Sequence, residues 1–234
     1  MTRAFDVASS TAATLLRLGA GWIARPVARQ PDRLLELYEF EACPFCRRAR
    51  EALSEFDVDA VIYPCPRGGT RFRPQVAAAG GKEQFPYLVD VNTGRSMYES
   101  AVIVSYVRKT YGGPKAPTWL GPLAVASAGL AAALRAGHGR AACPSRLPEK
   151  PLELWSFEAS PYSRLVREAL CELELPYVLH NVARGSPRRK AFVARSGKMM
   201  VPYMIDPNGA GPAATGMFES ADIVHYLRKT YGSG

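Results

Sequence analysis

The stretch MYESAVIVSYVRKTYG occupies Met97–Gly112, and a near-copy, MFESADIVHYLRKTYG, occupies Met217–Gly232. Upstream, LELYEFEACPFCRRAREAL at Leu35–Leu53 returns as LELWSFEASPYSRLVREAL at Leu152–Leu170. Self-similarity at a fixed offset over about 80 residues indicates two copies of one domain. Because there are only two copies, we expect each copy to close a hydrophobic core of its own.

The two copies differ at their cysteines. Cys43 of the first copy aligns with Ser160 of the second, and Cys46 aligns with Ser163. The chain therefore carries one candidate thiol site and a sister site with hydroxyl groups at the same two positions. A hydroxyl group does not take part in thiol–disulfide exchange, so the second copy is not a disulfide reductase by itself.

Length and charge set broad limits on the protein. The chain has 234 residues and a formal net charge of +9, and this length fits two domains of about 80 residues plus a connector. The positive charge suits an anionic small ligand, an acidic partner, a membrane surface or nucleic acid, and does not choose among them. The basic loop Arg184–Lys190 has no interleaved aromatic residues, so we expect no nucleic-acid partner.

The cysteines and the apolar runs bear on where in the cell the protein works. Five cysteines with a single C-x-x-C do not form a disulfide scaffold in a chain of this length. They indicate redox-active or buried thiols in a reducing compartment. No apolar run reaches the ~18 residues of a membrane span, so we expect a cytoplasmic protein without a transmembrane segment. The three histidines lie far apart, and we expect no metal site.

Residues 1–32 form an N-terminal extension with two interpretations. Met1–Arg29 is rich in arginine, serine and alanine and contains one acid, which is the composition of an organellar transit peptide. The protein would then work in a stroma or matrix. The alternative, which we favour, is an amphipathic helix over about Ala8–Ile23 that packs onto a domain. The apolar side chains expected at that contact are Leu15, Leu16, Leu18 and Trp22.

Each copy is predicted to be a β-α-β-α-β-β-α unit, over residues 33–113 and 150–234. Alternating apolar residues predict strands and helical spacing predicts helices, while Asn92-Thr93-Gly94 is typical of a hairpin turn. In the first copy the expected elements are Leu34–Phe40, Pro44–Phe56, Val58–Tyr63, Arg73–Ala79, Tyr87–Val91, Ser96–Tyr98 and Glu99–Tyr111. In the second copy they are Leu152–Phe157, Pro161–Leu173, Pro176–Asn181, Arg188–Arg195, Tyr203–Asp206, Gly216–Phe218 and Glu219–Tyr231.

Such units form small mixed sheets with helices on both faces, so the predicted fold class is α/β. Residues 114–149 link the two domains. This linker contains several prolines and a predicted helix at Leu123–Arg135. Because prolines stiffen a chain, we expect the domains to dock against each other rather than to float.

The C-P-F-C motif places Cys43 at the start of the predicted helix Pro44–Phe56. Free backbone N–H groups and the helix dipole stabilise a thiolate there, and Arg47 and Arg48 add positive potential. Both effects lower the pKa of Cys43 and make it the attacking sulfur. Cys46, one turn into the helix, is placed to resolve a mixed disulfide. The alternatives are a zinc half-site and two buried thiols without activity.

Two prolines mark a candidate binding surface. Phe85-Pro86 precedes a predicted strand, and Val201-Pro202 repeats the pattern. Opposite a C-x-x-C helix, this is the place where thioredoxin-like folds hold a cis peptide bond. The bend exposes backbone groups that pair with an extended, peptide-like ligand. The alternative is an ordinary proline at the start of a strand.

The last helix of each copy begins with an acid and a serine, Glu99-Ser100 and Glu219-Ser220. Free N–H groups at a helix start bind a carboxylate, the serine hydroxyl adds a donor, and the acid binds an ammonium group. A ligand with both an α-carboxylate and an α-amino group would match. The alternative is that each serine simply caps its helix.

Together these three elements resemble the N-terminal, glutathione-binding domain of the glutathione S-transferase family, with a C-P-F-C of the glutaredoxin type. The resemblance is strongest to tandem proteins that carry two such domains in one chain. It covers Leu34–Gly112 and Leu152–Gly232, and F-P-Y-L followed by M-Y-E-S-A is fairly specific to the family. The resemblance implies two thioredoxin-like domains joined by a partly helical linker, with glutathione as cosubstrate.

The resemblance also implies a glutathione site in the first copy. Cys43 would attack or bond the glutathione sulfur, and the backbone of Phe85, before Pro86, would pair with the cysteinyl moiety. The residues that would hold the two ends of the tripeptide are Glu99 and Ser100 at the γ-glutamyl end and Lys82 at the glycyl carboxylate. The matching positions of the second copy are Ser160, Ser163, Lys198, Val201, Pro202, Glu219 and Ser220.

Three functions follow from the resemblance. The first, which we favour, is a glutathione-dependent thiol–disulfide oxidoreductase that uses Cys43 and Cys46 on disulfide or glutathionylated substrates. The second is a non-catalytic glutathione-binding or scaffold protein. The third is a transferase in which Ser160 hydrogen-bonds the glutathione thiolate. Full transferases continue into a helical domain that builds the pocket for the electrophile, and Pro114–Lys150 is too short to be one.

Overall fold

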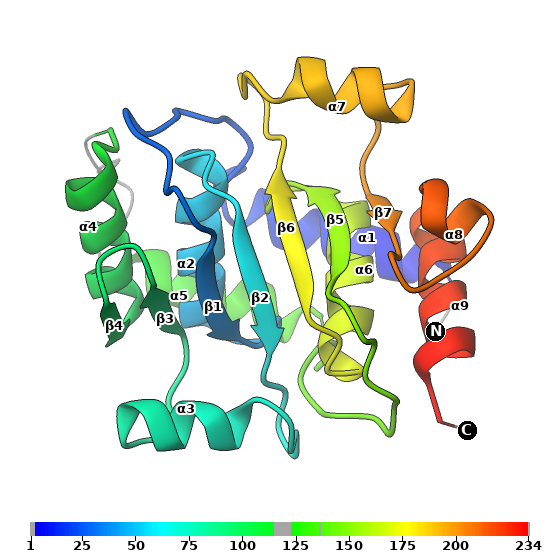
Figure 1. Ribbon diagram of the computed structural model, residues 1–234, viewed down its shortest axis with the longest axis horizontal. Coiled ribbons are helices and arrows are strands. Elements are labelled where there is room, and N and C mark those ends of the chain that lie inside the picture. The colour runs from blue at the N-terminus through cyan, green and yellow to red at the C-terminus, as the bar shows by residue number, and fades with distance from the viewer. Residues whose placement is uncertain (1–2, 115–122, 136, 234) are drawn as a thin grey trace.

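The computed structural model describes residues 3–114, 123–135 and 137–233. Two similar α/β units lie side by side in it, and their strands form one sheet (Figure 1). Repeat one consists of β1 (Leu35–Glu39), α2 (Pro44–Glu55), β2 (Ala60–Pro64), α3 (Arg73–Gly80), β3 (Tyr87–Asp90), β4 (Arg95–Tyr98) and α4 (Ser100–Tyr111). Repeat two consists of β5 (Leu152–Ser156), α6 (Pro161–Glu172), β6 (Tyr177–Asn181), α7 (Arg189–Ser196), β7 (Tyr203–Ile205), α8 (Pro212–Thr215) and α9 (Ser220–Tyr231).

The predicted α/β fold with two thioredoxin-like units is confirmed. In repeat one the predicted elements all form, with bounds that differ by a few residues. None of the helices in the described part of the chain is long and apolar enough to cross a membrane. The part of the linker that spans residues 115–122 lies outside the described residues.

One prediction for repeat two is wrong. The segment Gly216–Phe218 does not form a strand and makes a single bridge, between Met217 and Met204. In repeat one a short turn joins β3 to β4, whereas in repeat two the corresponding connection is longer and contains Pro207, Pro212 and the helix α8. Proline cannot donate to a strand ladder, so the hairpin does not continue.

Strands β2 and β6 join the two repeats by antiparallel pairing. Val61 faces Val178 across this junction, and these two valines occupy the same position in the internal alignment. A residue that pairs with its own counterpart lies on an approximate two-fold axis. The repeats are therefore arranged like the two subunits of a symmetric dimer, and the strand order is β4-β3-β1-β2-β6-β5-β7.

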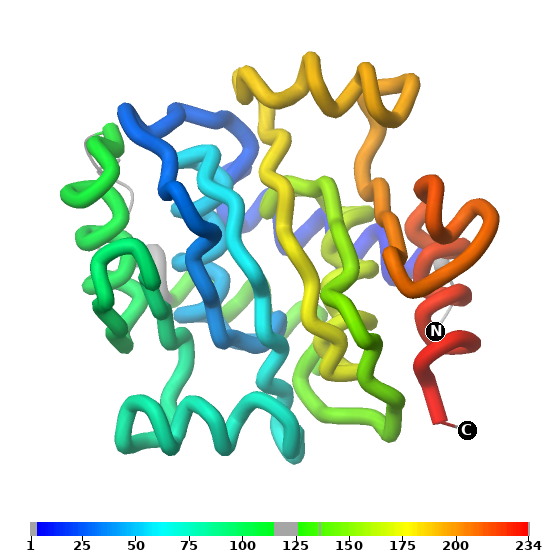
Figure 2. Tube along the Cα trace, viewed as in Figure 1, coloured from blue at the N-terminus to red at the C-terminus, as the bar shows by residue number. Residues whose placement is uncertain are grey.

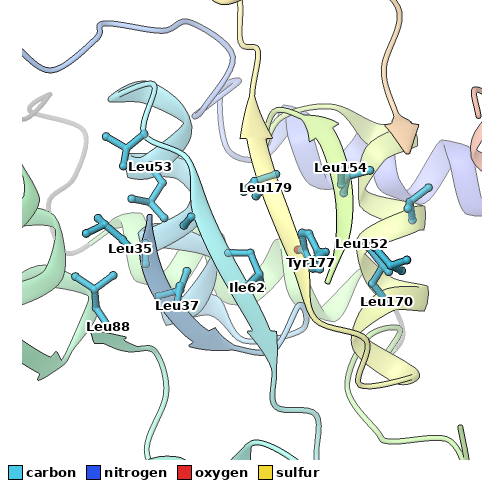
Figure 3. Close-up of a cluster of buried hydrophobic side chains, with 14 of the residues drawn as sticks. Leu35, Leu37, Leu53, Ile62, Leu88, Leu152, Leu154, Leu170, Tyr177 and Leu179 are labelled. Carbon is cyan, nitrogen blue, oxygen red and sulfur yellow. The ribbon is translucent and has the colours of Figure 1, made fainter. Parts of the chain in front are cut away.

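The two repeats share one hydrophobic core, so the prediction of two separate cores is wrong. Leu35, Leu37 and Leu88 of repeat one belong to the same buried cluster as Leu152 and Leu154 of repeat two (Figure 3). Two smaller aromatic clusters lie against α3 and α7. Because a sheet and a core both cross the junction, the repeats form one body, and the expectation that they dock is confirmed.

A helix precedes each repeat and packs on the other repeat. The chain path in Figure 2 shows α1 (Arg3–Leu15) behind the strands of repeat two, where it packs against α6. Helix α5 (Leu123–Ala133) packs against α2 of repeat one. The segments that follow these helices also correspond, since Leu16–Pro26 and Leu134–Pro144 share the pattern L-R-x-G-x-G-x-x-A-x-P. Each repeat therefore includes a leading helix that it exchanges with its partner.

The exchanged segments approach the opposite repeat closely at two glycines. Gly21 has φ +78°, and a Cβ built there would lie 2.9 Å from the Cβ of Glu158. Gly139 has φ +68°, and a Cβ built there would lie 2.7 Å from the Cβ of Glu41. Because both the backbone angle and the contact exclude larger side chains, glycine is required at each of these counterpart positions.

The prediction for the packing of the N-terminal helix is wrong in the face that it assigned to the contact. The helix packs onto a domain as predicted, but the large apolar side chains expected at the contact are exposed, namely Leu15, Leu16, Leu18 and Trp22. Of these, Trp22 contacts repeat two through its ring, whose centre lies 5.9 Å from that of Phe157. The polar face is buried instead: the Thr14 hydroxyl donates to the carbonyl of Ala159 at 3.1 Å, and Arg17 Nη2 lies 2.6 Å from Glu51 Oε2. The surface that receives this helix is itself polar, so amphipathicity indicated the wrong face.

Two equivalent buried ion pairs cross the junction, each joining an arginine of one repeat to a glutamate of the other. Arg50 Nε of α2 lies 3.1 Å from Glu158 Oε2, and its counterpart Arg167 Nε of α6 lies 3.2 Å from Glu41 Oε2. All four side chains are almost fully buried. Burial raises the pKa of Glu158, but the arginine charges, that of Arg167 first, outweigh burial and hold the pKa at about 2. Each glutamate also pairs within its own repeat, Glu158 with Arg167 at 3.0 Å and Glu41 with Arg50 at 3.2 Å, so the four charges form one network across the junction.

We expect Glu158→Gln to lower the free energy of unfolding by about 3–5 kcal/mol, because it leaves buried arginines without their counter-charge. Urea denaturation followed by circular dichroism measures this loss. Since the pKa of Glu158 lies below its ordinary value of 4.5, the stabilisation is present above that pH and is lost as the pH falls towards 2. The control is Glu149→Gln at an exposed position, which should change stability by less than about 0.5 kcal/mol. A loss of similar size in both variants would contradict the assignment.

Candidate functional site

Cys43 is the N-cap residue of α2, and Pro44 is the first helical residue. Proline suits this place because its fixed φ matches the helix and the first turn needs no donor from it. Cys43 has extended backbone, which lets its Sγ accept the backbone N–H of Cys46 at 3.3 Å. The sulfur therefore lies at the positive end of the helix, as the sequence predicted.

The two thiols of the motif have opposite pKa shifts. The pKa of Cys43 is lowered to about 7; the hydrogen bond from the Cys46 thiol is the largest cause, helped by backbone N–H groups and opposed by burial. Burial raises the pKa of Cys46 well above its ordinary value, and the hydrogen bond and charge of Cys43 raise it further. The pair therefore ionises at Cys43 in preference to Cys46.

Arg50 takes the electrostatic part that the sequence assigned to Arg47 and Arg48. Its charge also lowers the pKa of Cys43, after the larger effects of the hydrogen bonds from the Cys46 thiol and from the backbone N–H groups. Arg47 is buried, and its Nε lies 3.6 Å from Glu158 Oε1. The cation that favours the thiolate is thus the same arginine that crosses the junction between the repeats.

Cys43 lines a groove of about 570 Å³ between the start of α2 and the leading helix of repeat two. The residue is only 5% exposed, so its sulfur is shielded from bulk solvent and opens onto the groove. The residues that line this groove are Phe40, Ala42, Cys43, Pro44, Arg67, Ala132, Ala133, Gly137 and Arg140. We call it the Cys43 groove.

Both predicted proline positions have the backbone conformation that the sequence indicated. The peptide bonds Phe85-Pro86 and Val201-Pro202 are both cis, which confirms the prediction. Phe85 belongs to the same buried cluster as Cys43 and Cys46. The structure therefore brings the residue predicted to pair with a cysteinyl backbone next to the reactive sulfur.

Glu99 and Glu219 are the N-cap residues of α4 and α9, and both have positive φ, +69° and +65°. Neither glutamate side chain caps its helix, and Ser100 and Ser220 lie one residue later, so the alternative of serine capping is wrong. Helix starts without a side-chain cap can offer their N–H groups to an anion. Non-glycine residues in such conformations cluster at ligand-binding positions.

The lysines predicted to meet a glycyl carboxylate contact aromatic rings instead. Lys82 Nζ lies 4.8 Å from the centre of the Tyr98 ring, and Lys198 Nζ lies 4.4 Å from the centre of the Phe218 ring. Both lysines are exposed. Neither Lys82 nor the other predicted glutathione-binding residues of repeat one is among the described residues that line the Cys43 groove; those others are Phe85, Pro86, Glu99 and Ser100.

Repeat two holds a larger pocket, of about 800 Å³, around Ser160. Five of the positions singled out from the sequence line it, namely Ser160, Val201, Pro202, Glu219 and Ser220. The rest of its wall is Thr11, Thr14, Leu15 and Trp22 from α1 and the segment after it, and Phe157, Pro161, Tyr162, Met199 and Met200 from repeat two. Ser163 does not line this Ser160 pocket and is fully buried.

Two hydroxyl groups give the Ser160 pocket its chemistry. Ser160 Oγ accepts the backbone N–H of Ser163 at 3.2 Å, the same bond that Cys43 makes in repeat one. A hydroxyl that accepts this bond keeps its own proton to donate. Ser220 is 2% exposed, and its Oγ has no hydrogen-bond partner in the described part of the chain. A buried hydroxyl at a pocket wall is suited to bind a ligand atom.

Cys171 has a structural role. Its thiol donates to the carbonyl of Gly139 at 3.3 Å, and its sulfur accepts the N–H of Glu41 at 3.4 Å. Its counterpart Ser54 makes the same two bonds to the matching glycine and glutamate. No three His, Cys, Asp or Glu side chains within the described ranges are grouped so that they could hold a metal ion.

The walls of both sites contain residues that the sequence motifs did not indicate. Leu15 and Trp22 line the Ser160 pocket, and Ala133 and Arg140 line the Cys43 groove. These residues lie far from the motifs along the chain: Leu15 and Ala133 belong to the exchanged leading helices, and Trp22 and Arg140 to the segments that follow them. The repeated pattern in Leu16–Pro26 and Leu134–Pro144 is the signal that would have revealed them.

Comparisons with known proteins identify the family. The family model of the glutathione S-transferase N-terminal domain matches residues 37–115 and 154–234. A solved structure of a trimeric glutathione transferase from Leishmania, TDR1, is similar over 86% of this chain and 68% of that chain, with 15% sequence identity and a TM-score of 0.31. No curated protein sequence matches this chain. Since the family model matches twice and covers more than half of the sequence, the chain belongs to the glutathione S-transferase N-terminal domain family.

Proposed function

We propose that this protein is a glutathione-dependent thiol–disulfide oxidoreductase of the glutaredoxin type, with Cys43 as nucleophile and Cys46 as resolving thiol. The observation that carries the proposal is the pairing, at one helix start, of a thiol with a pKa of about 7 and a neutral, buried thiol. The thiolate is the attacking species, and a thiol whose pKa is close to the ambient pH attacks most effectively. Membership of the family supports glutathione as the reductant.

The exchange runs in two balanced steps. The Cys43 thiolate attacks the glutathionyl sulfur of a mixed disulfide, a bond forms between the two sulfurs, and the substrate leaves as a thiolate. A second glutathione thiolate then attacks the glutathionyl sulfur on Cys43, which releases oxidised glutathione and restores the Cys43 thiolate. One disulfide is reduced and two glutathione sulfurs become joined, so the electrons balance.

Cys46 serves substrates that bond to Cys43 through their own sulfur. Once the Cys43 sulfur is in a mixed disulfide, its negative charge is gone, and this charge is one of the causes that keep Cys46 protonated. Cys46 can then lose its proton, attack Cys43 and release the reduced substrate, which leaves a Cys43–Cys46 disulfide for glutathione to reduce. The opposite pKa shifts therefore set the order in which the two thiols react, Cys43 first and Cys46 second.

Glutathione would bind across the elements that surround Cys43. The Phe85 backbone before the cis proline would pair with the cysteinyl moiety, and the start of α4 at Glu99 and Ser100 would hold the γ-glutamyl end. The start of α4, which the Glu99 side chain does not cap, supports this placement. Lys82, which contacts Tyr98, is not needed for it.

We expect alkylation of Cys43 to be half-maximal near pH 7, below the ~8.5 of a free cysteine. In Cys46→Ala the midpoint should rise towards the free value, because the largest cause of the lowered pKa is the bond from the Cys46 thiol. Mass spectrometry of alkylated peptides over a pH series gives both midpoints. An unchanged midpoint in the variant would contradict this coupling.

We expect Cys43→Ser to reduce the rate of reduction of a glutathionylated peptide by at least about 10³-fold, because it removes the nucleophile. The matched control is Ser160→Ala in the counterpart site, which should leave this rate within about twofold. A coupled assay that follows oxidised glutathione measures both. Glutathione binding without turnover in the wild-type protein would favour a scaffold or binding role over an oxidoreductase.

A specific observation favours a second function in repeat two. The Ser160 pocket gathers a hydroxyl donor, a cis proline and the start of α9 in one cavity. Leu15 of α1 and Trp22 of the segment after it give the pocket an apolar wall. We propose that this pocket binds glutathione, with Ser160 donating its hydroxyl proton to the thiolate. The exchanged helix α1 then supplies the helical wall that the linker is too short to build, so transfer of glutathione to an apolar electrophile is a second candidate activity.

We expect Ser220→Ala to weaken glutathione binding at this pocket by about tenfold, because a buried donor to a carboxylate contributes about 1.5 kcal/mol or more. Calorimetry on a Cys43→Ser background isolates the non-covalent affinity. The matched substitution Ser100→Ala tests repeat one in the same way. If neither serine affects any glutathione-binding event, the two helix starts do not hold the γ-glutamyl end.

A further inference from the structure

The Cys43 groove and the Ser160 pocket are counterparts, and their walls differ in charge. The carbonyl of Trp22 accepts the N–H of Arg184 at 2.9 Å, and the carbonyl of Arg140 accepts the N–H of Arg67 at 2.6 Å. These matching bonds place Trp22 and Arg140 at equivalent points of the two sites. The Ser160 pocket therefore has an indole ring where the Cys43 groove has a guanidinium group.

The rest of the wall provided by the leading helices differs in size. Leu15 and Thr14 line the Ser160 pocket, and their counterparts in the Cys43 groove are Ala133 and Ala132. The alanines leave room beside Cys43, and the apolar contact surface that Leu15 gives to repeat two is smaller there. Positive charge and small wall residues, rather than apolar contact, distinguish the groove at the thiol.

Two arginines in the Cys43 groove are available to a ligand. Arg67 and Arg140 are exposed, and neither side chain has a hydrogen-bond or ion-pair partner among the described residues. Among the residues that the structure describes, no carboxylate lines this groove. The nearby acids Glu41 and Glu168 are already paired, with Arg167 and with Arg135. Two guanidinium groups beside a reactive sulfur match carboxylates, which they can bind through paired hydrogen bonds.

We propose that the Cys43 groove selects glutathionylated polypeptide segments that carry acidic residues next to the modified cysteine, and that Arg67 and Arg140 select them. This inference rests on the proposed oxidoreductase function. In the exchange, Cys43 attacks the glutathionyl sulfur, and the acidic segment is the leaving thiolate. Its carboxylates pair with the two arginines while its sulfur departs into the groove. Arg67 and Arg140 bind substrate and take no part in the electron transfer.

The test uses the full-length protein and two synthetic peptides, each with one glutathionylated cysteine, flanked by glutamates in one and by glutamines in the other. At low salt we expect kcat/KM to be about tenfold higher for the glutamate peptide. This preference should shrink as sodium chloride is added, because salt screens exposed charges. The double variant Arg67→Gln/Arg140→Gln should bring the ratio of the two peptides close to one.

Two further variants separate charge from structure. Arg140→Trp, which introduces the residue of the counterpart site, should also abolish the preference for the acidic peptide. The control is Arg184→Gln, because Arg184 is the counterpart of Arg67 and makes the matching backbone hydrogen bond. This variant should keep the preference for the acidic peptide. If the wild-type protein turns over both peptides equally, or the double variant keeps the preference, the charge selection is wrong and the oxidoreductase function stands. If neither peptide is reduced, the charge selection and the proposed oxidoreductase function are both wrong.

Discussion

The crossed ion pairs between Arg50 and Glu158 and between Arg167 and Glu41 are the constraint on which both sites depend. Each glutamate lies two residues before its site residue, Glu41 before Cys43 and Glu158 before Ser160. Charges this deeply buried are stable only when they are paired. Each glutamate pairs with an arginine of the other repeat as well as with one of its own, so the loops that present the two sites share one buried charge network.

The approximate two-fold arrangement explains why the repeats are alike in scaffold and different in chemistry. Residues that serve the junction keep their contacts even when their chemistry changes, as Ser54 and Cys171 show by making the same two bonds. Residues that face the cavities have diverged, as Cys43 and Ser160 have. Contacts at the junction are constrained by packing on both sides, whereas a side chain at a cavity is constrained only by its ligand.

The exchange of the leading helices connects fold to function. Helices α1 and α5 close over the site of the opposite repeat and provide walls that a thioredoxin-like unit lacks. The segments that follow these helices are anchored to their own repeats by ion pairs, Arg17 with Glu51 and Arg135 with Glu168. The polarity of each cavity is thus set by two parts: a helix start of the same geometry in both repeats, and a wall from the other repeat whose residues differ between the two sites.

The sequence by itself determined the features that depend on local pattern. Strand and helix periodicity, the C-P-F-C at a helix start and the two prolines before strands predicted the α/β units, the position of Cys43 and both cis bonds. These follow from residues close together along the chain. The internal repeat showed that there are two units, and their motifs indicated the family that the comparisons then identified.

Only the tertiary structure decided how the two units meet. The register of Val61 against Val178, the polar packing of α1 and the role of Arg50 beside Cys43 all come from contacts between distant segments. Amphipathicity could not reveal them, because a helix that packs on a charged surface turns its polar face inward. The walls of the sites followed from that packing, and so did the difference in charge between the two cavities.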